Sequence, residues 1–356
     1  MRRWSTRAGA AFGAAAICMT LALRCDAAPH IRLLATGGTI AGVSDASGAT
    51  SYAAGKLRVE QMLTQVSGLA QVAQLSTEQV LNVPSQDLRD EDRLLLARRV
   101  LASLNDAAVD AIVITHGTDT LEETAFFLDL IAFGPKPIVL TGAMRPADAV
   151  SADGPGNILD AVTVAASSSA RGRGVLVVLN ETIHDARTVT KVRGEIGGFE
   201  SPHAAVGNVH GGHVRLPARD QPGTRQPRFS INDTVRSLPR VEIVLAYAGM
   251  SGSLIRAAAQ DGARAIVIAG VGAGNMSREA RDSVAAVVRT GMLVVRASRS
   301  PGVRVERNGE IDDDALGTVV ADTLSPQKLR ILCQLALLTP QSAESLQKLI
   351  FAATGV

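Results

Sequence analysis

The sequence predicts an α/β fold built on parallel sheets. Short, continuously apolar runs rich in Val, Ile and Leu alternate with longer segments of helical period. Strands that are apolar on both sides occur in parallel sheets with helices over both faces. The 356 residues suit about two domains, and the 46% hydrophobic content can build a sizeable core. A proline-rich stretch, residues 216–239, interrupts the alternation and is interpreted as an interdomain linker or a surface excursion.

Each apolar run between polar turns is an expected strand, and each segment of helical period is an expected helix. The expected strands are Ile31–Ala35, Ala111–Thr115, Pro137–Thr141, Val175–Leu179, Val241–Ala246, Ala265–Ala269 and Met292–Ala297. The expected helices are Asp90–Leu104, Leu121–Ile131, Asn157–Ala166, Gly252–Gln260, Arg278–Arg289 and Gln327–Leu338. Ligands of such sheets lie beyond the carboxyl ends of the strands, so the turns there are where we expect a site.

The first 27 residues have the layout of a cleaved secretory signal peptide. A basic head precedes a small, apolar run from Ala8 to Leu23, and small residues follow before Pro29. A retained membrane anchor is the weaker interpretation, because the run is short and rich in alanine. Cleavage after Ala27 would remove two of the three cysteines and leave Cys333, so no internal disulfide could form. We therefore expect a periplasmic or secreted protein without membrane contact after cleavage.

Charge and residue spacing disfavour several classes of partner. A formal net charge of +2 gives no indication of nucleic acid or acidic partners. Neither the dinucleotide nor the Walker spacing is present in "TGGTIAG", and "AGVGAGN" (residues 269–275) is interpreted as a structural turn between strand and helix. The histidines have no metal-like spacing with cysteines or carboxylates, so we expect no metal site.

The turn after the first strand combines glycines with a hydroxyl. Two glycines in "TGGTIAG" let the backbone turn tightly and bring its N–H groups close to a ligand, and Thr39 projects from this turn. A plain glycine turn is the structural alternative. The small, polar stretch that follows, Val43–Gly55, is interpreted as a mobile lid that carries Tyr52 to the site. A Tyr52 packed on the surface is the alternative.

Other strand ends carry similar chemistry. Thr118 and Asp119 follow the strand in "AIVITHGTDTLEETAFFL", Ser85 lies in "NVPSQDL", and Lys191 lies in "TVTKV". Each has a structural alternative. Thr118 or Asp119 could cap the following helix, with glutamates in its first turn. Ser85 could also be a cap, and an isolated lysine such as Lys191 is usually solvated.

Together these segments resemble the bacterial type II L-asparaginases. The resemblance extends from about Ile31 to the C-terminus. The motifs that carry it are "LLATGGTIAG", "SYAAGK", "NVPSQDL", "ITHGTDTLEETAFFLDL", "TGAMRPADAVSADGPGN", "RGVLVVLNETIHDARTVTK" and "GEIDDDALGTVVADTLSPQKLRILCQLAL". It implies a larger, mostly parallel-sheet N-terminal domain and a smaller parallel α/β C-terminal domain. With the signal peptide at 1–27 and the linker at 216–239, these domains would span 28–215 and 240–356.

The resemblance also implies a reaction and an assembly. Members of the family hydrolyse the side-chain amide of L-asparagine, and often of L-glutamine, to the acid and ammonia without a cofactor. They are typically homotetramers with each site at the interface of an intimate dimer. In this sequence, the implied catalytic residues are Thr39 as nucleophile, Tyr52, Thr118, Asp119 and Lys191. The implied substrate-binding residues are Gly38, Ser85, Gln86, Gly117, Thr118, Asp119, Ala143 and, from a neighbouring subunit, Glu310.

These roles agree with elementary chemistry. A free amino acid is a zwitterion, so its buried carboxylate needs donors such as Ser85 and its ammonium needs carboxylates such as Asp119 and Glu310. Amide hydrolysis needs a nucleophile, a proton acceptor and donors directed at the developing oxyanion. Lys191 can accept a proton only in its neutral form, and the sequence does not fix its charge.

One departure from the family concerns specificity. In "LAYAGMSG", Gly249 and Met250 stand where many relatives carry an asparagine, which leaves the preference between asparagine and glutamine open. Two alternative functions are also open. The protein could be a glutaminase-asparaginase that uses both amides comparably, or an exported amino-acid-binding protein that has lost catalysis. A binding protein has no need for Thr39, Thr118 and Lys191 together, so we expect an enzyme.

Overall fold

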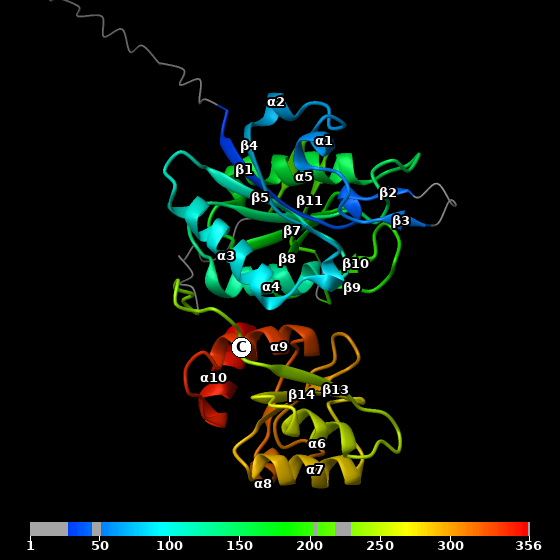
Figure 1. The fold of residues 1–356 in the computed structure, drawn as a ribbon, viewed down its shortest axis with the longest axis vertical. Coiled ribbons are helices and arrows are strands. Elements are labelled where there is room, and N and C mark those ends of the chain that lie inside the picture. Colours follow the sequence, from blue (N-terminus) through cyan, green and yellow to red (C-terminus); the bar gives the residue numbers. More distant parts are fainter. Residues whose placement is uncertain (1–27, 45–50, 203–204, 218–228, 355–356) are drawn as a thin grey trace, which may run out of the picture.

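The computed structural model describes residues 28–44, 51–202, 205–217 and 229–354. The predicted signal peptide, residues 1–27, lies outside this range, as do parts of the predicted lid and linker. Figure 1 shows two α/β units joined end to end, each built around its own sheet. Within the described ranges, no helix has both the length and the apolar character needed to cross a membrane.

The N-terminal sheet has eight strands in the order β12-β11-β8-β7-β6-β5-β1-β4. The five strands from β7 to β4 are parallel, whereas β8, β11 and β12 are antiparallel to their neighbours. Their bounds are β1 (His30–Gly37), β4 (Gln74–Val83), β5 (Ala111–Thr115), β6 (Ile138–Thr141), β7 (Val175–Leu179), β8 (Thr182–Asp185), β11 (Gly207–His210) and β12 (His213–Arg215). The predicted mostly parallel domain is confirmed, with an antiparallel edge that the apolar runs did not indicate.

Helices cover both faces of this sheet because its strands are apolar on both sides. Ile112 and Ile114 of β5 pack with α3 (Asp90–Asn105) and α4 (Leu121–Ile131). Ala111 and Val113 of the same strand pack on the opposite face. The helices there are α1 (Val59–Leu63), α2 (Leu69–Val72) and α5 (Gly154–Ala166). Alternation along a strand thus divides the core into two layers.

The C-terminal sheet is smaller and entirely parallel, in the order β13-β14-β15-β16. Its strands are β13 (Val241–Leu245), β14 (Ala265–Gly270), β15 (Leu293–Ser298) and β16 (Val319–Val320). One face packs against α6 (Ser253–Gln260) and α7 (Arg278–Val288). The other face packs against α9 (Pro326–Ala336) and α10 (Ala343–Thr354), and α8 (Asp313–Leu316) lies next to α7. The smaller parallel α/β unit is therefore as predicted.

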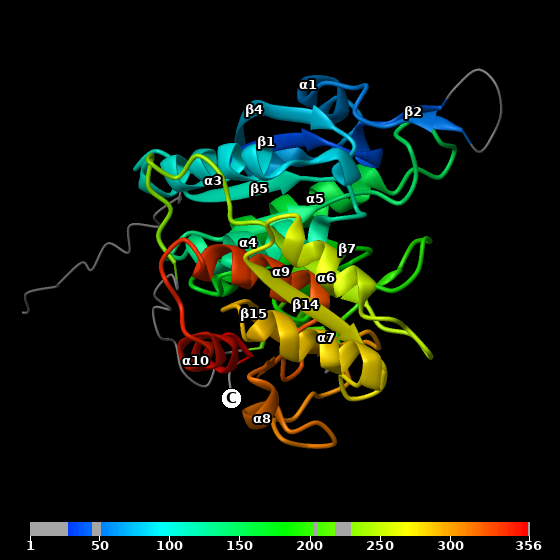
Figure 2. The ribbon, with the colours of Figure 1, turned by 60° about the horizontal axis from the view of Figure 1, so that its bottom comes forward.

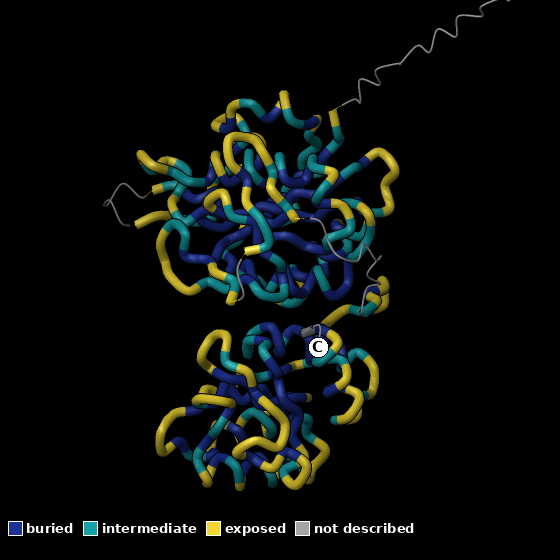
Figure 3. Tube along the Cα trace, turned by 180° about the vertical axis from the view of Figure 1, so that it is seen from behind, coloured by how far each residue is buried: buried dark blue, intermediate teal, exposed yellow. Residues whose placement is uncertain are grey.

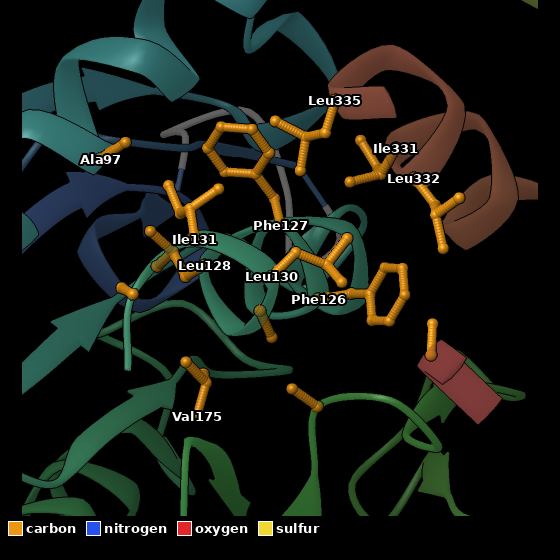
Figure 4. Close-up of a cluster of buried hydrophobic side chains, with 14 of the residues drawn as sticks. Ala97, Phe126, Phe127, Leu128, Leu130, Ile131, Val175, Ile331, Leu332 and Leu335 are labelled. Atoms are coloured by element: carbon orange, nitrogen blue, oxygen red, sulfur yellow. The ribbon is translucent and has the colours of Figure 1, made fainter. Parts of the chain in front are cut away.

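Helix α9 joins the two units. It lies between the C-terminal sheet and α4, as the turned view in Figure 2 shows. In Figure 4 side chains of α4 face those of α9 across this junction, and the six named next are at most 1% exposed. The labelled contacts are Phe126, Phe127 and Leu130 from α4 and Ile331, Leu332 and Leu335 from α9. One continuous apolar core therefore runs from the first sheet into the second. Cys333 lies within this core, and burial raises the pKa of its thiol to about 12.

Most predicted elements agree with the structure to within a few residues. The start of α5 differs, at Gly154 rather than Asn157, because a proline in the first helical turn is accepted where an N–H would be free anyway. Strand β4 was not predicted, since its residues are mostly half-buried and polar. The turn at residues 269–275 connects β14 to the region before α7, as predicted. In Figure 3 the central strands of both sheets are buried and the connecting loops are exposed.

Candidate active site

The predicted site residues gather at one edge of the N-terminal sheet. Strands β4, β1, β5 and β6 are adjacent and parallel, so their carboxyl ends meet there. The chain runs from β1 outward to β4 and returns across β1 to β5, which creates a switch point between β1 and β5. Ligands of doubly wound sheets bind at such a point. The turns that follow these strands carry Gly38 and Thr39, Ser85 and Gln86, Gly117 to Asp119, and Ala143.

Three of these turns are in direct contact. Gly38 has a positive φ of 82°, and a Cβ atom there would lie 2.3 Å from the Cα of Gly117. A Cβ on Gly117 would in turn lie 2.7 Å from Ser85 Oγ. The hydroxyl of Thr120 donates to the Ser85 carbonyl at 2.9 Å and adds a polar link between the second and third turns. Glycine is therefore required at both positions for the turns to approach.

Replacing Gly38 with alanine is expected to destabilise the fold by at least about 2 kcal/mol, because the new Cβ meets backbone at a left-handed position. The matched control is Gly134→Ala. Gly134 also lies in a loop, but a Cβ there would meet no atom within 4 Å. Urea unfolding of both variants measures the difference. Equal midpoints for the two variants would contradict the close approach.

Thr39 is held next to Tyr52. It is the first residue of a short 3-10 helix, Thr39–Ala41, and is 9% exposed. Its Oγ1 lies 2.9 Å from the Tyr52 hydroxyl. Tyr52 begins β3 (Tyr52–Ala53), which pairs with β2 (Val43–Ser44), and Ser44 is bonded to the Asp148 carboxylate. The stem of the predicted lid is therefore in contact with the site, while residues 45–50 lie outside the described residues.

Thr118, Asp119 and Lys191 form a second cluster. Lys191 Nζ lies 2.9 Å from Thr118 Oγ1 and 2.6 Å from Asp119 Oδ1. Lys191 lies in β9 (Thr190–Lys191), which pairs with β10 (Phe199–Glu200), and it is therefore not a free solvated lysine.

The alternative in which Thr118 or Asp119 caps α4 is wrong, because Thr120 is the N-cap residue of α4 and no side chain caps this helix. The alternative cap role of Ser85 is also wrong, since α3 is preceded by Arg89.

Both clusters border one cavity of about 500 Å³, a volume within the range of small-molecule sites. Its lining residues are Gly38, Thr39, Tyr52, Ala53, Ala54, Lys56, Pro84, Ser85, Gln86, Gly117, Thr118 and Asp119. Sequence reasoning did not single out Lys56, although the motif "SYAAGK" ends on it. The Asp119 side chain is 60% exposed, so one of its carboxylate oxygens remains open to a ligand.

Three predicted residues are not part of this lining: Lys191, Ala143 and Glu310. Lys191 contacts the lining only through its bonds to Thr118 and Asp119. Ala143 is fully buried behind Gly142. A Cβ atom on Gly142 would lie 2.6 Å from the His116 carbonyl oxygen and 3.0 Å from Thr118 Cγ2, so no side chain fits there. Glu310 lies in the C-terminal unit, where its carboxylate accepts a hydrogen bond from Asn275 at 2.5 Å. The structure therefore does not bring Glu310 to the cavity of its own chain.

His116 supports the site from behind. It is fully buried, its Nδ1 lies 2.8 Å from the Gly117 carbonyl, and its Nε2 has no partner among the described residues. Burial lowers its pKa to about 4, so the ring is neutral near pH 7. The described residues contain no group of three or more His, Cys, Asp or Glu side chains that could hold a metal.

Acidification is expected to destabilise the protein through its buried histidines. Burial lowers the pKa of His184 to about 4, as for His116, whereas an unfolded histidine titrates near 6.5. The unfolded state therefore binds more protons between these values, and stability is lost as the pH falls from about 6.5 to 4. The expected loss at pH 5 is about 2 kcal/mol for each histidine. Urea unfolding of the wild type and His184→Gln at pH 7 and pH 5 should show a smaller loss in the variant.

Comparisons with known proteins agree with this geometry. Residues 30–222 match the family "Asparaginase, N-terminal", and residues 240–350 match the "Glutaminase/Asparaginase C-terminal domain". L-asparaginase 2 of Escherichia coli strain K12 is 42% identical over 328 residues, which cover 91% of this chain and 93% of the relative. Glutaminase-asparaginase of Pseudomonas fluorescens biotype A is also 42% identical, over 90% of both chains. A crystal structure of a probable cytoplasmic L-asparaginase from Campylobacter jejuni superposes with a TM-score of 0.85 at 36% identity, covering 91% of this chain and 99% of that chain.

Proposed function

The chain belongs to the asparaginase family, and on this premise we propose that it is an L-asparaginase that hydrolyses L-asparagine to L-aspartate and ammonia. The observation that carries the proposal is the pairing of two activated threonines on one cavity. Thr39 lies against Tyr52, and Thr118 lies against Lys191. A cavity that only bound an amino acid would have no use for two such hydroxyls.

In the first step, Thr39 Oγ1 forms a bond to the carboxamide carbon of the substrate. The threonine proton passes to the Tyr52 hydroxyl, which lies at hydrogen-bond distance, and from there toward the amide nitrogen. The C–N bond breaks, ammonia leaves, and an aspartyl ester remains on Thr39. Backbone N–H groups of the glycine-rich turns are the available donors for the developing oxyanion.

In the second step, water cleaves the ester. In its neutral form, Lys191 accepts the Thr118 proton, the Thr118 oxygen takes a proton from water, and the resulting hydroxide attacks the ester carbon. The Asp119 carboxylate, 2.6 Å from Nζ, stabilises the ammonium that forms on Lys191. The ester bond breaks, and the Thr39 oxygen regains a proton as Lys191 gives up the one it accepted. Aspartate then leaves.

The substrate is held as a zwitterion. Ser85 is the donor for the α-carboxylate, and the exposed oxygen of Asp119 is the acceptor for the α-ammonium. Gly38, Gln86 and Gly117 complete the wall of the cavity. We propose that Ala143 acts only through its backbone, because its side chain is buried away from the cavity.

We propose that the chain assembles into a homotetramer and that Glu310 of a second subunit completes each site. Two observations support this. Glu310 lies outside the cavity of its own chain, and the C-terminal unit exposes an apolar row on and after its edge strand β13. The exposed residues of this row are Ile243, Leu245, Tyr247 and Leu254. We further propose a periplasmic or secreted location, supported by the basic and apolar N-terminus and by the name of a 40% identical relative from Haemophilus influenzae, "Probable L-asparaginase periplasmic".

Steady-state release of ammonia from L-asparagine and from L-glutamine tests the proposed function. We expect turnover of asparagine and slower turnover of glutamine. Gly249 has a positive φ and no side chain, and Met250 is 1% exposed, so neither supplies the polar group that many relatives have here. Equal rates would indicate a glutaminase-asparaginase. A thermal shift by aspartate without any ammonia release would instead indicate a binding protein and contradict the proposal.

A further inference from the structure

The first turn of α9 contacts both segments that carry the second catalytic cluster. Gln327 and Lys328 are consecutive residues in this turn. They bond to separate parts of the N-terminal unit, one next to Thr118 and the other next to Lys191. No role in the reaction proposed above requires either residue to touch the substrate.

Lys328 binds the chain just before Lys191. Its Nζ donates to the Arg187 carbonyl at 2.9 Å and to the Val189 carbonyl at 2.5 Å. Both carbonyls belong to the connection between β8 and β9, and Lys191 is the last residue of β9. The Lys328 side chain is 2% exposed, and its bond to the Val189 carbonyl is buried. Its position therefore determines where this connection lies.

Gln327 binds the start of α4. Its Nε2 donates to Glu122 Oε1 at 3.0 Å. Glu122 is 5% exposed and lies in the first turn of α4, directly after the turn that carries Thr118 and Asp119. The N-terminus of α4 favours this negative charge, and the amide of Gln327 satisfies one of its oxygens.

All three hydrogen bonds originate from one helix. Helix α9 packs along α4 through the apolar side chains of Figure 4, so its first turn cannot move independently of the core. Retaining an ammonium here is costly. Burial lowers the pKa of Lys328 to about 8, and an apolar side chain would avoid this desolvation. The desolvation of this lysine therefore indicates that its hydrogen bonds, and not only its volume, are needed here.

We propose that Lys328 is a positioning residue that holds Lys191 Nζ at hydrogen-bond distance from Thr118 Oγ1, with Gln327 fixing the opposite side of the pair through Glu122. The inference rests on the proposed function. A shift of about 1 Å between reacting groups can cost about 100-fold in rate. The C-terminal unit thereby contributes to the site of its own chain, in addition to any residue that it supplies to another subunit.

The test compares Lys328→Met with Lys136→Met in the full chain. Lys136 Nζ also donates to two backbone carbonyls, those of Ser103 and Asp106, but it lies between α4 and β6 at the opposite end of the sheet. We expect Lys328→Met to lower kcat for L-asparagine by about 10- to 100-fold with KM changed by less than about threefold. Lys136→Met should leave both constants near the wild-type values.

Two further variants separate positioning from stability. Gln327→Met should lower kcat by about threefold to tenfold, whereas Gln334→Met should not. Gln334 lies in the same helix and donates likewise to a carboxylate, that of Asp90. Lys328→Arg should recover part of the lost kcat, because it restores the donors and the adjoining cavity of about 130 Å³ offers room for the longer group. Equal kcat in Lys328→Met and Lys136→Met, or no recovery with arginine, would overturn the proposal.

A crystal structure of Lys328→Met provides a readout that does not depend on activity. We expect the Lys191 Nζ to Thr118 Oγ1 distance to exceed its present 2.9 Å by about 1 Å or more. An unchanged distance would contradict the positioning role even if the variant is slow. Failure of the wild type to release ammonia would contradict only the proposed function.

Discussion

Thr39→Ala is expected to lower kcat for L-asparagine by about 1,000-fold or more, which corresponds to about 4 kcal/mol of activation free energy. The reason is that Thr39 Oγ1 is the atom that attacks the amide carbon, and no other hydroxyl among the residues that the structure describes is bonded to Tyr52. KM should change by less than about threefold, because the zwitterion is held by Ser85 and Asp119 rather than by Thr39. Steady-state ammonia release measures both constants.

Three controls make this result specific. Thr39→Ser keeps the hydroxyl and should retain measurable turnover. The thermal midpoint of Thr39→Ala should match the wild type, since only a side chain in a turn is shortened. In the wild type, rapid acid quenching followed by peptide mass analysis should place an aspartyl ester on the peptide that contains Thr39. An ester on the peptide that contains Thr118, or near-normal turnover of Thr39→Ala, would reverse the roles assigned to the two threonines.

The parts of the site that follow strands were accessible from the sequence. Thr39 and Thr118 each follow an apolar run that was predicted as a strand, whereas the strand before Ser85, β4, was not predicted. Parallel strands carry their carboxyl ends to a common edge. The glycines of "TGGTIAG", Gly38 among them, indicated a tight turn, whereas Gly117 was assigned only as a substrate-binding residue by the family resemblance. The reason that both must be glycine, namely the 2.3 Å approach of one turn to the other, depends on which strands are neighbours and is not visible in either motif alone.

The partners of Lys191 could not be predicted from local pattern. Lys191 is far along the chain from Thr118, and it reaches the site only because β8 turns antiparallel to β7 and leads into β9. Its sequence neighbourhood, "TVTKV", gives no sign of that reversal. The family resemblance assigned Lys191 a role, and the geometry supplies the contact that such a role needs.

The same limitation applies to Lys328 and Glu122. In the sequence, Glu122 was an expected helix-start residue, and the structure confirms that it lies in the first turn of α4. Its burial and its bond to Gln327 arise from the packing of α9 against α4, which no pattern in either helix specifies. Long-range polar contacts of this kind are determined by tertiary packing, so they appear only once the fold is known.

Lys191→Met is expected to lower kcat for L-asparagine by about 1,000-fold. The variant removes the only atom within hydrogen-bond distance of both Thr118 Oγ1 and Asp119 among the described residues, and methionine preserves the length and apolar stem of the side chain. Because Lys191 acts on water in the second step, the Thr39 ester should accumulate in this variant and be detectable after acid quenching. Lys56→Met is the matched control, since Lys56 lines the same cavity and the substitution removes the same functional group. If Lys56→Met were equally slow, or if no ester accumulated in Lys191→Met, the general loss of an amino group at the cavity rather than of proton transfer through Thr118 would explain the result.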